Sequence, residues 1–308
     1  MRIAIFGATS EIAQDLILSF AAHNDHQLVL LARRTEAVVQ WLSEINLPNK
    51  YPVIHYDLFK SITGLDAILN FVGGGDPAKI NDYGSAIFEA TLDFDELAIS
   101  YLKSNPNCRY VFMSSGAAYG SDFNLPVDEK SLGVFPINSI EPKDWYGIAK
   151  MYCECRHRMH SNFHIVDVRI FSYFSKSQNI NSKFLICEIL RAMMSKEIFK
   201  TSAENIVRDY LAPTDLYQLI KKILLSPPIN MAVDCYSRAP IDKLSLLDYL
   251  SKNFGLQYEV SKIEIGMQPT GNKLNYYSLN RRAAHFGYEP EYNSLESLLL
   301  QVKNFIRG

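Results

Sequence analysis

The chain opens with Met1-Arg2-Ile3-Ala4-Ile5-Phe6-Gly7-Ala8-Thr9-Ser10-Glu11-Ile12-Ala13, an apolar run that leads through a turn of small residues into a helix. The run up to Phe6 is almost wholly apolar, as in a parallel strand buried on both faces, and Gly7 ends it. Apolar residues then recur at a four-residue spacing and predict a helix over residues 11–22. A helix that begins beside a glycine turn offers free amide groups and a positive dipole end, which suit a pyrophosphate. A strand-turn-helix unit with a packing role alone is the alternative interpretation.

The same pattern of apolar strands and amphipathic helices continues to about residue 174 and predicts an α/β fold built on a parallel sheet. The expected strands are 27–32, 52–56, 67–72, 109–113, 163–171 and 231–236, and the expected helices of this part are 35–45, 83–102, 145–160 and 214–225. Thr214 is the predicted N-cap of the last of these helices. Beyond residue 175 the regular alternation is lost, and helices are expected over 183–194, 245–254 and 295–306.

Composition places the chain among ordinary soluble proteins. Its 308 residues are 48% hydrophobic, enough for one large core or two smaller ones, and its formal charge of −2 gives no bulk attraction to nucleic acid or to an anionic membrane. No apolar run approaches the roughly 20 residues of a membrane span. The first strand follows Met1 without room for a signal peptide, so we expect a cytoplasmic protein.

Cysteine and histidine positions give no sign of a disulfide framework or a metal site. The five cysteines are odd in number and scattered along the chain, so we expect reduced thiols. His157, His160 and His164 straddle a predicted helix end and a strand, and surface or hydrogen-bonded histidines are a better interpretation than a metal triad. No metal is therefore expected.

Two pairs of polar residues are candidates for chemistry. Tyr146 and Lys150 are four residues apart near the start of a predicted helix, so they share one of its faces. A neighbouring ammonium favours the phenolate, so this spacing suits a tyrosine that exchanges protons at neutral pH. Ser114 and Ser115 come at the carboxyl end of a predicted strand, the edge at which open parallel sheets bind ligands.

Taken together, four stretches resemble the extended short-chain dehydrogenase/reductase family in their order and separation. They are the first glycine turn, the strand Tyr110-Val111-Phe112-Met113-Ser114-Ser115-Gly116, the stretch Tyr146-Gly147-Ile148-Ala149-Lys150, and Arg208-Asp209-Tyr210-Leu211-Ala212-Pro213. The resemblance covers nearly the whole chain and points to the branch of nucleotide-sugar epimerases, dehydratases and ketoreductases. It implies a Rossmann-type doubly wound parallel sheet with a smaller mixed α/β C-terminal substrate lobe. The implied NAD(P)-binding domain is 1–174, with 211–237 returning to it, and the implied substrate lobe is 175–210 and 238–308.

The resemblance also implies a row of cofactor contacts, contributed by Gly7, Thr9, Ser10, Glu11, Ile12, Asp57, Phe71, Val72, Gly73, Tyr146 and Lys150. Asp57 would lie near the adenine ring. The chain departs from the family where two later glycines fall on Ser10 or Glu11 and on Ala13, although Ser10 and Ala13 are small enough for close packing.

The identity of the cofactor depends on the end of the second strand. Arg33 and Arg34 stand where NAD-preferring members of such folds carry an acidic residue for the ribose hydroxyls. Two guanidinium groups suit a 2′-phosphate, so NADP is the predicted cofactor and NAD the less favoured one. Solvation of a surface turn by these arginines is the alternative.

By the same resemblance, Ser115 would orient the reacting oxygen and Tyr146 would transfer its proton. Lys150 would lower the pKa of the phenol and bind the nicotinamide ribose. Ser114 is expected to hydrogen-bond to backbone instead.

The substrate-binding residues implied by the resemblance are Ser115, Gly116 and Arg208. Arg208 would bind a phosphate, or else form a structural pair with Asp209, in a strand expected over 202–210. Gly116-Ala117 stands where dehydratases carry an acid pair, so dehydration is disfavoured.

These features predict NADP-dependent reduction of a keto group on a nucleotide-linked sugar, in surface-polysaccharide or deoxysugar biosynthesis. One alternative is an NAD-dependent nucleotide-sugar 4-epimerase. Another, of a different class, is a non-catalytic dinucleotide-binding or redox-sensing protein, and a non-sugar carbonyl substrate also stays open. The family resemblance further implies a homodimer through the helices near 83–103 and 146–160. Neither the sugar nor the carbon acted upon follows from these residues.

Overall fold

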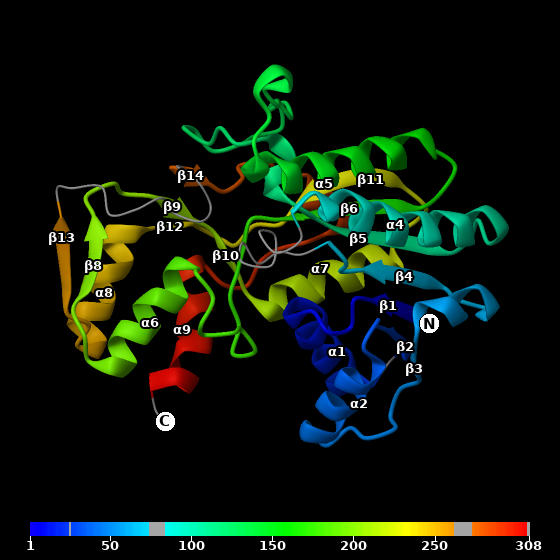
Figure 1. Ribbon diagram of the computed structural model, residues 1–308, viewed down its shortest axis with the longest axis horizontal. Helices are drawn as coiled ribbons and strands as arrows, with labels where there is room; N and C mark the ends of the chain where they lie inside the picture. The colour runs from blue at the N-terminus through cyan, green and yellow to red at the C-terminus, as the bar shows by residue number, and fades with distance from the viewer. Residues whose placement is uncertain (25, 74–83, 262–272, 307–308) are drawn as a thin grey trace.

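The computed structural model describes residues 1–24, 26–73, 84–261 and 273–306, and it has a central sheet with helices on both faces (Figure 1). Seven strands form this sheet in the order β11-β6-β5-β4-β1-β2-β3, and every neighbouring pair is parallel. The strands are β1 (Arg2–Phe6), β2 (Gln27–Leu31), β3 (Val53–Ile54), β4 (Ala67–Asn70), β5 (Arg109–Ser115), β6 (Ile165–Ile170) and β11 (Asn230–Asp234). The predicted Rossmann-type fold is confirmed.

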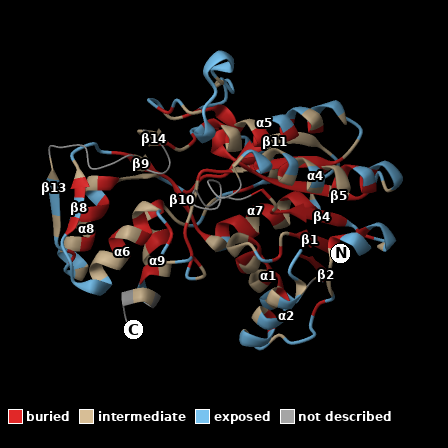
Figure 2. Cartoon of the chain, in the orientation of Figure 1, coloured by how far each residue is buried: buried red, intermediate tan, exposed pale blue. Residues whose placement is uncertain are grey.

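Each face of the sheet has its own hydrophobic core because successive strand residues point to opposite sides. Ile3 and Ile5 of β1 pack with the helices of one face, whereas Ala4 and Phe6 pack with those of the other. The first face carries α1 (Glu11–His23), α2 (Thr35–Glu44) and α7 (Pro213–Leu225), and the second carries α4 (Ile87–Ser104) and α5 (Pro142–Met159). Buried residues fill the sheet and the helix surfaces that face it (Figure 2).

The strand order reverses beside β1. From β1 the chain proceeds to β2 and β3 on one side, and then crosses to β4 on the other side. At such a reversal the loops leave in opposite directions and open a crevice at the carboxyl ends of the strands. The turn after β1 and the chain after β4 lie at this reversal.

A second group of elements lies beside the sheet, at the left of Figure 1. Its helices share a separate hydrophobic core and are α6 (Leu185–Ser195), α8 (Lys243–Phe254) and α9 (Ser294–Ile306). Short strands accompany them: β8 (Phe199–Ser202) pairs with β13 (Tyr258–Ser261), and β9 (Val207–Arg208) lies between β12 (Ile241–Asp242) and β14 (Asn275–Tyr276). Two further strands, β7 (Ser172–Tyr173) and β10 (Tyr210–Leu211), pair where the chain passes between this group and the sheet.

Two C-terminal segments return to the sheet. Residues 211–237 contribute α7 and β11, as described above. Residues 282–288, which the predicted domain division places in the substrate lobe, also pack on the first face, where Ala283 and Tyr288 join the core around α7. The division into two domains at the predicted residues stays a prediction.

Element boundaries differ from the prediction where local chemistry sets them. Thr214 is not the N-cap of α7, because Pro213 occupies the first helical position, which its fixed φ suits, and Ala212 precedes it as N-cap. The single strand expected over 202–210 is divided among β8, β9 and β10. Helix α5 begins at residue 142, earlier than expected, and the amide of Glu141 donates to the Asp144 carboxylate at 3.0 Å.

Among the residues that the structure describes, no helix is long and apolar enough to cross a membrane. All five cysteines are free, as predicted.

Candidate active site

Three predicted catalytic residues lie at the carboxyl end of β5 and on the adjoining helix α5. Ser115 is the last residue of β5, and Tyr146 and Lys150 occupy successive turns near the start of α5. Gly147 lets this helix approach the chain beyond β5, because a Cβ at that position would lie 2.4 Å from the carbonyl oxygen of Ala117. The fold therefore brings these three side chains to one edge of the sheet.

Lys150 is buried and is held by backbone oxygens. Its ammonium donates to the carbonyl of Val72 at 3.1 Å and to that of Met113 at 2.9 Å, and it lies 4.4 Å from the ring centre of Phe112. Burial lowers the pKa of Lys150 to about 8. The ammonium thus ties α5 to β5 and to the chain that leaves β4.

Gly73 makes room for that ammonium. Its φ is +112°, and a Cβ there would lie 2.9 Å from Lys150 Nζ and 3.1 Å from Thr91 Oγ1. A side chain at this position would therefore compete with Lys150 for space. The two further glycines of the predicted glycine-rich turn, Gly74 and Gly75, lie outside the described residues.

The pKa of Tyr146 is raised, contrary to the prediction of a phenol made acidic by Lys150. Burial raises the pKa of Tyr146 and the nearby Tyr276 phenol raises it further, whereas the Ser115 hydroxyl lowers it. The Lys150 ammonium lies 5.8 Å from the centre of the Tyr146 ring and is already engaged by two carbonyl oxygens. Desolvation therefore outweighs the cation in this structure.

The glycine turn after β1 lies close to the chain that leaves β4. Gly7 has a φ of +76°, and a Cβ there would lie 3.2 Å from backbone atoms of Phe71 and Val72. Helix α1 begins at Glu11, and the side chain of its N-cap Ser10 makes no capping hydrogen bond. The turn is therefore lined by backbone and faces a helix N-terminus without a side-chain cap, which fits a bound diphosphate.

Glu11, the first residue of α1, directs its carboxylate to another loop. It accepts hydrogen bonds from the Gln178 side chain at 2.7 Å and from the Asn179 amide at 3.2 Å. One turn further along α1, the buried Asp15 accepts from Tyr173 at 2.8 Å and from Ser177 at 2.7 Å. These contacts fasten the loop beyond β7 to the start of α1.

The residues predicted to bind the adenosine end are exposed. Arg33 and Arg34 follow β2 and are both exposed, and the Asp57 side chain is 86% exposed and lies 3.0 Å from His55 Nδ1. Tyr56, which stands between His55 and Asp57 in the sequence, is buried, and its hydroxyl accepts a hydrogen bond from the Gly7 amide at 2.7 Å. Sequence reasoning missed this residue. Its position next to Asp57 is the signal in the sequence that could have identified it.

Arg208 is buried on β9 beside β14. It donates to the carbonyl oxygens of Val207 and Lys273, both at 2.8 Å, and burial lowers its pKa. Asp209 instead accepts from Ser237 and Ser294, so Arg208 and Asp209 turn to different partners. The alternative of an Arg208–Asp209 pair is not supported.

Tyr276 of β14 reaches the predicted catalytic serine. Its hydroxyl lies 3.2 Å from Ser115 Oγ, and its ring is 4.7 Å from that of Phe123 and 5.2 Å from that of Phe171. The Phe171 ring also covers Gly116, where a Cβ would lie 2.4 Å from it. Sequence reasoning missed Tyr276, because no local pattern relates it to a residue 161 positions earlier.

A family model described as the NAD-dependent epimerase/dehydratase family matches residues 3–231. The chain belongs to this family. The predicted NAD(P)-dependent oxidoreductase or epimerase of the short-chain dehydrogenase/reductase type is confirmed at that level, and the non-catalytic alternative gains no support. No curated protein matches the sequence.

Solved structures of epimerase/dehydratase-type enzymes share the fold at low identity. A UDP-glucuronic acid 4-epimerase from Bacillus cereus, in complex with UDP-glucuronic acid and NAD, is 14% identical with a TM-score of 0.81, over 100% of this chain and 99% of that one. A UDP-N-acetylglucosamine 4-epimerase from Methanobrevibacter ruminantium, in complex with UDP-N-acetylmuramic acid, is 15% identical with a TM-score of 0.80, and the match covers 99% of this chain and 97% of that one. A dTDP-glucose 4,6-dehydratase from Bacillus anthracis, in complex with NAD, is 14% identical with a TM-score of 0.78, over 100% and 97%.

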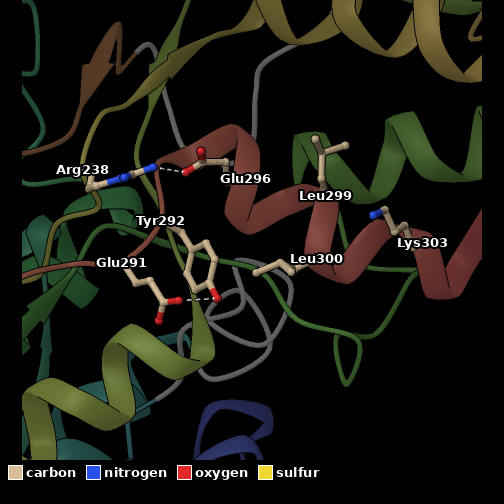
Figure 3. Close-up of a pocket in the computed structure, with 7 residues that line it drawn as sticks. All are labelled: Arg238, Glu291, Tyr292, Glu296, Leu299, Leu300 and Lys303. Carbon is tan, nitrogen blue, oxygen red and sulfur yellow. Dashed lines mark hydrogen bonds and ion pairs between the residues drawn. The ribbon is translucent and has the colours of Figure 1, made fainter.

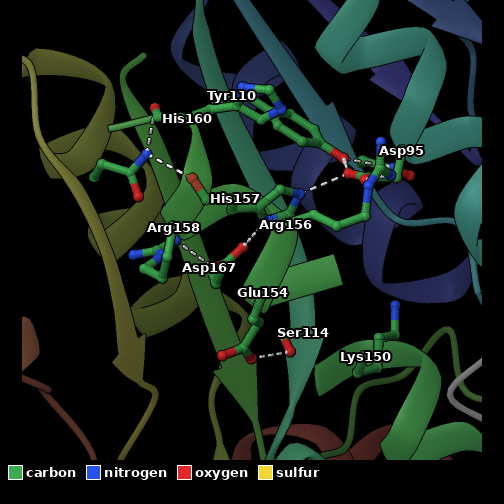
Figure 4. Close-up of polar contacts among 12 residues, drawn as sticks. Asp95, Tyr110, Ser114, Lys150, Glu154, Arg156, His157, Arg158, His160 and Asp167 are labelled. Atoms are coloured by element: carbon green, nitrogen blue, oxygen red, sulfur yellow. Dashed lines mark hydrogen bonds and ion pairs between the residues drawn. The ribbon is translucent and has the colours of Figure 1, made fainter. Parts of the chain in front are cut away.

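Buried ion pairs hold α5 in place behind the candidate site (Figure 4). His157 lies between two buried carboxylates, with Nε2 2.6 Å from Asp95 and Nδ1 2.5 Å from Asp167. Burial disfavours the imidazolium, but Asp167 and Asp95 outweigh it and raise the pKa of His157 to about 9. His157 is therefore a paired cation that joins α5 to α4 and β6.

Ser114 belongs to a second buried network on α5. Its hydroxyl donates to the Glu154 carboxylate at 2.6 Å (Figure 4), and Glu154 forms an ion pair with Arg169 at 2.5 Å. The prediction that Ser114 bonds to backbone is wrong, because a carboxylate on the neighbouring helix is within reach. Ser114 thus fixes the helix, while Ser115 faces Tyr276.

A groove of about 350 Å³ lies away from these residues, along α9 (Figure 3). Arg238 and Glu296 form an ion pair at 2.5 Å across its wall, and the Tyr292 hydroxyl donates to Glu291 at 2.9 Å. The groove contains none of the predicted site residues.

Proposed function

We propose that the protein is an NAD-dependent 4-epimerase of a nucleotide-linked sugar. The main support is the convergence of Ser115, Tyr146 and Lys150 beside the chain after β4, which the Gly7 turn also approaches. Similar structures include 4-epimerases bound to nucleotide sugars, one of them also holding NAD. The comparisons thus favour epimerisation, the alternative from sequence, over reduction of a keto group.

The turn around Gly7 is the proposed seat of NAD. Gly7, Thr9, Ser10 and Ile12 would surround the diphosphate, which the N-terminus of α1 attracts. Asp57 would bind the adenosine, and Lys150 would bind the nicotinamide ribose in place of one of its carbonyl contacts. When bound, NAD supplies a hydride acceptor and donor for one sugar carbon.

Side chains of the protein would carry out the proton transfer. The phenolate form of Tyr146 accepts the proton of the sugar hydroxyl and the resulting phenol returns it, while Ser115 hydrogen-bonds the same oxygen. The raised pKa of Tyr146 keeps its phenol protonated in the resting protein. Tyr146 must therefore release its own proton to solvent before it can act as a base, and the positive charge on Lys150 stabilises the phenolate so formed, although it does not abolish the effect of burial.

NADP-dependent reduction of a keto group is the second candidate, and Arg33 and Arg34 favour it. Their exposed side chains at the end of β2 suit a 2′-phosphate. Similar structures hold NAD, however, so the predicted preference for NADP has no support among them. Dehydration stays disfavoured because the Phe171 ring leaves no room for an acidic side chain at Gly116.

The test begins with the purified protein. Nicotinamide released on denaturation identifies the bound cofactor, and inversion of carbon 4 in UDP-glucose, UDP-glucuronic acid or UDP-N-acetylglucosamine is followed by proton NMR. Tyr146→Phe should lower kcat by about 100-fold or more, because proton transfer is lost. Tyr152→Phe is the matched control, since Tyr152 is a half-exposed tyrosine of the same helix.

Full activity in Tyr146→Phe would remove Tyr146 from the mechanism. Consumption of NADPH with a keto sugar, without inversion of any substrate, would favour the reductase. A cytoplasmic role in surface-polysaccharide or deoxysugar synthesis is part of the same proposal.

A further inference from the structure

The hydroxyl of Ser115 already has two hydrogen-bonding neighbours. A serine hydroxyl donates one hydrogen bond and accepts two. Ser115 Oγ accepts from the Ala117 amide at 3.2 Å, lies 3.2 Å from the Tyr276 hydroxyl, and interacts with the Tyr146 phenol. A substrate oxygen that took the place of the Tyr276 hydroxyl would therefore keep its hydrogen bond to Ser115.

Of these three groups, Tyr276 is the one that a substrate can replace. The Ala117 amide belongs to the 3₁₀ turn that continues β5, and Tyr146 is the proposed proton-transfer group. Tyr276 comes from β14, a strand of two residues. Its hydroxyl also neighbours Tyr146, whose pKa it raises. The Tyr276 hydroxyl thus stands where a reacting sugar hydroxyl would meet both Ser115 and Tyr146.

The Tyr276 ring is held in this position from several sides. It makes the aromatic contacts with Phe123 and Phe171 described above, and the Lys273 ammonium lies 4.5 Å from its centre. On the backbone, β14 pairs with β9. The side chain is only 7% exposed. A substrate must therefore displace an ordered ring as well as break a hydrogen bond.

We infer that Tyr276 is a specificity-determining residue: its phenol occupies the binding position of the reacting sugar hydroxyl, and only a sugar that displaces it is admitted. The inference rests on the proposed function. Tyr276 would thus discriminate between sugars, whereas Ser115, Tyr146 and Lys150 would act on any hydroxyl that reaches them.

The test compares a ligand whose sugar would reach Ser115 with a ligand that has no sugar. Calorimetric titration of the NAD-loaded protein gives the affinity for UDP-glucose and for UDP, which lacks the sugar. Tyr276→Phe removes the hydroxyl and keeps the ring, so UDP-glucose should bind roughly three- to tenfold tighter, the value of one hydrogen bond, while UDP binds as before. Tyr277→Phe, at the adjacent position, should change neither affinity.

A second variant separates the ring from its hydroxyl. Tyr276→Ala should bind UDP-glucose at least as tightly as Tyr276→Phe does, because it removes the ring as well as the hydroxyl from the position of the sugar. The thermal midpoint of each variant shows whether the aromatic cluster still folds.

Each outcome decides the inference. Equal affinities of the wild type and Tyr276→Phe for UDP-glucose, with turnover intact, overturn it and leave the proposed function standing. Weaker binding by Tyr276→Phe also overturns it, because the hydroxyl is then a substrate ligand. Binding gained only in the Tyr276 variants, without turnover, supports the inference while the proposed function fails. No binding by any form overturns both.

Discussion

At the scale of single residues, the site depends on the position of the Lys150 ammonium. The ammonium is buried and donates to the carbonyls of Val72 and Met113. An ammonium without such partners would be costly to bury, and even with them its pKa falls to about 8. Gly73 is the residue that permits this arrangement, because any Cβ there would lie 2.9 Å from Lys150 Nζ.

Gly73→Ala should therefore harm both the fold and cofactor binding. With a φ of +112° and a close contact with Lys150, the added methyl group should lower the free energy of unfolding by about 2–3 kcal/mol. The affinity for NADH, measured by fluorescence titration, should fall as well. Gly255→Ala is the matched control, because Gly255 has a φ of +75° and open space around it, so its loss should be about 1 kcal/mol without an effect on NADH. Equal effects of the two substitutions would show that the contact with Lys150 does not matter.

At the scale of elements, α5 is the helix on which the site depends. Its first turns carry Tyr146 and Lys150, and its later turns carry Glu154 and His157, which bind β6 and α4 through buried ion pairs. The proposed catalytic residues and the anchoring groups are thus parts of one helix. Weakening an anchor should loosen the whole helix against the sheet.

His157 gives this anchoring a pH dependence. Its pKa rises from 6.5 to about 9 on folding, so its stabilisation is complete below pH 6.5 and is lost as the pH rises through 9. The lost contribution is on the order of 2–3 kcal/mol. Urea unfolding of the wild type and of His157→Gln at pH 6 and pH 9 should show a difference in stability that shrinks by this amount. Comparison with the variant is needed because Lys150, with its lowered pKa, acts in the opposite direction. A difference that does not change with pH would mean that His157 is not the titrating group.

At the scale of the whole molecule, the predicted homodimer would bring together the α4–α5 faces of two copies. Between these helices lies an apolar groove of about 190 Å³, lined by Phe88, Leu92 and Tyr152 among others. Leu92→Lys should raise the dimer dissociation constant about 100-fold, because it places a charge in this groove. Sedimentation velocity measures the change, and Val39→Lys on the opposite face of the sheet is the control. A wild type that stays monomeric at all concentrations would rule out the dimer.

Sequence alone could predict the parts of the molecule that depend on local spacing. The alternation of β1, α1 and their successors gave the fold, and the four-residue spacing placed Tyr146 and Lys150 on one face. Local reasoning failed where distant segments meet. The partner of Ser115 comes from residue 276, and Ser114 bonds to a helix 40 residues away. The predicted direction of the Tyr146 pKa shift is wrong. Burial, which depends on tertiary packing, raises this pKa and outweighs the effect of the Lys150 cation, which is predicted from sequence spacing.

The position of Tyr276 and Tyr288 near the C-terminus has a consequence for biosynthesis. Tyr276 borders Ser115, and Tyr288 packs into the core around α7, yet both leave the ribosome long after the strands they complete. Translation proceeds at about 5–20 residues per second, so the interval between Tyr146 and Tyr276 lasts on the order of ten seconds. A nascent chain therefore exposes its half-built candidate site and part of its core to chaperones throughout that interval, and truncation before residue 276 leaves both unfinished.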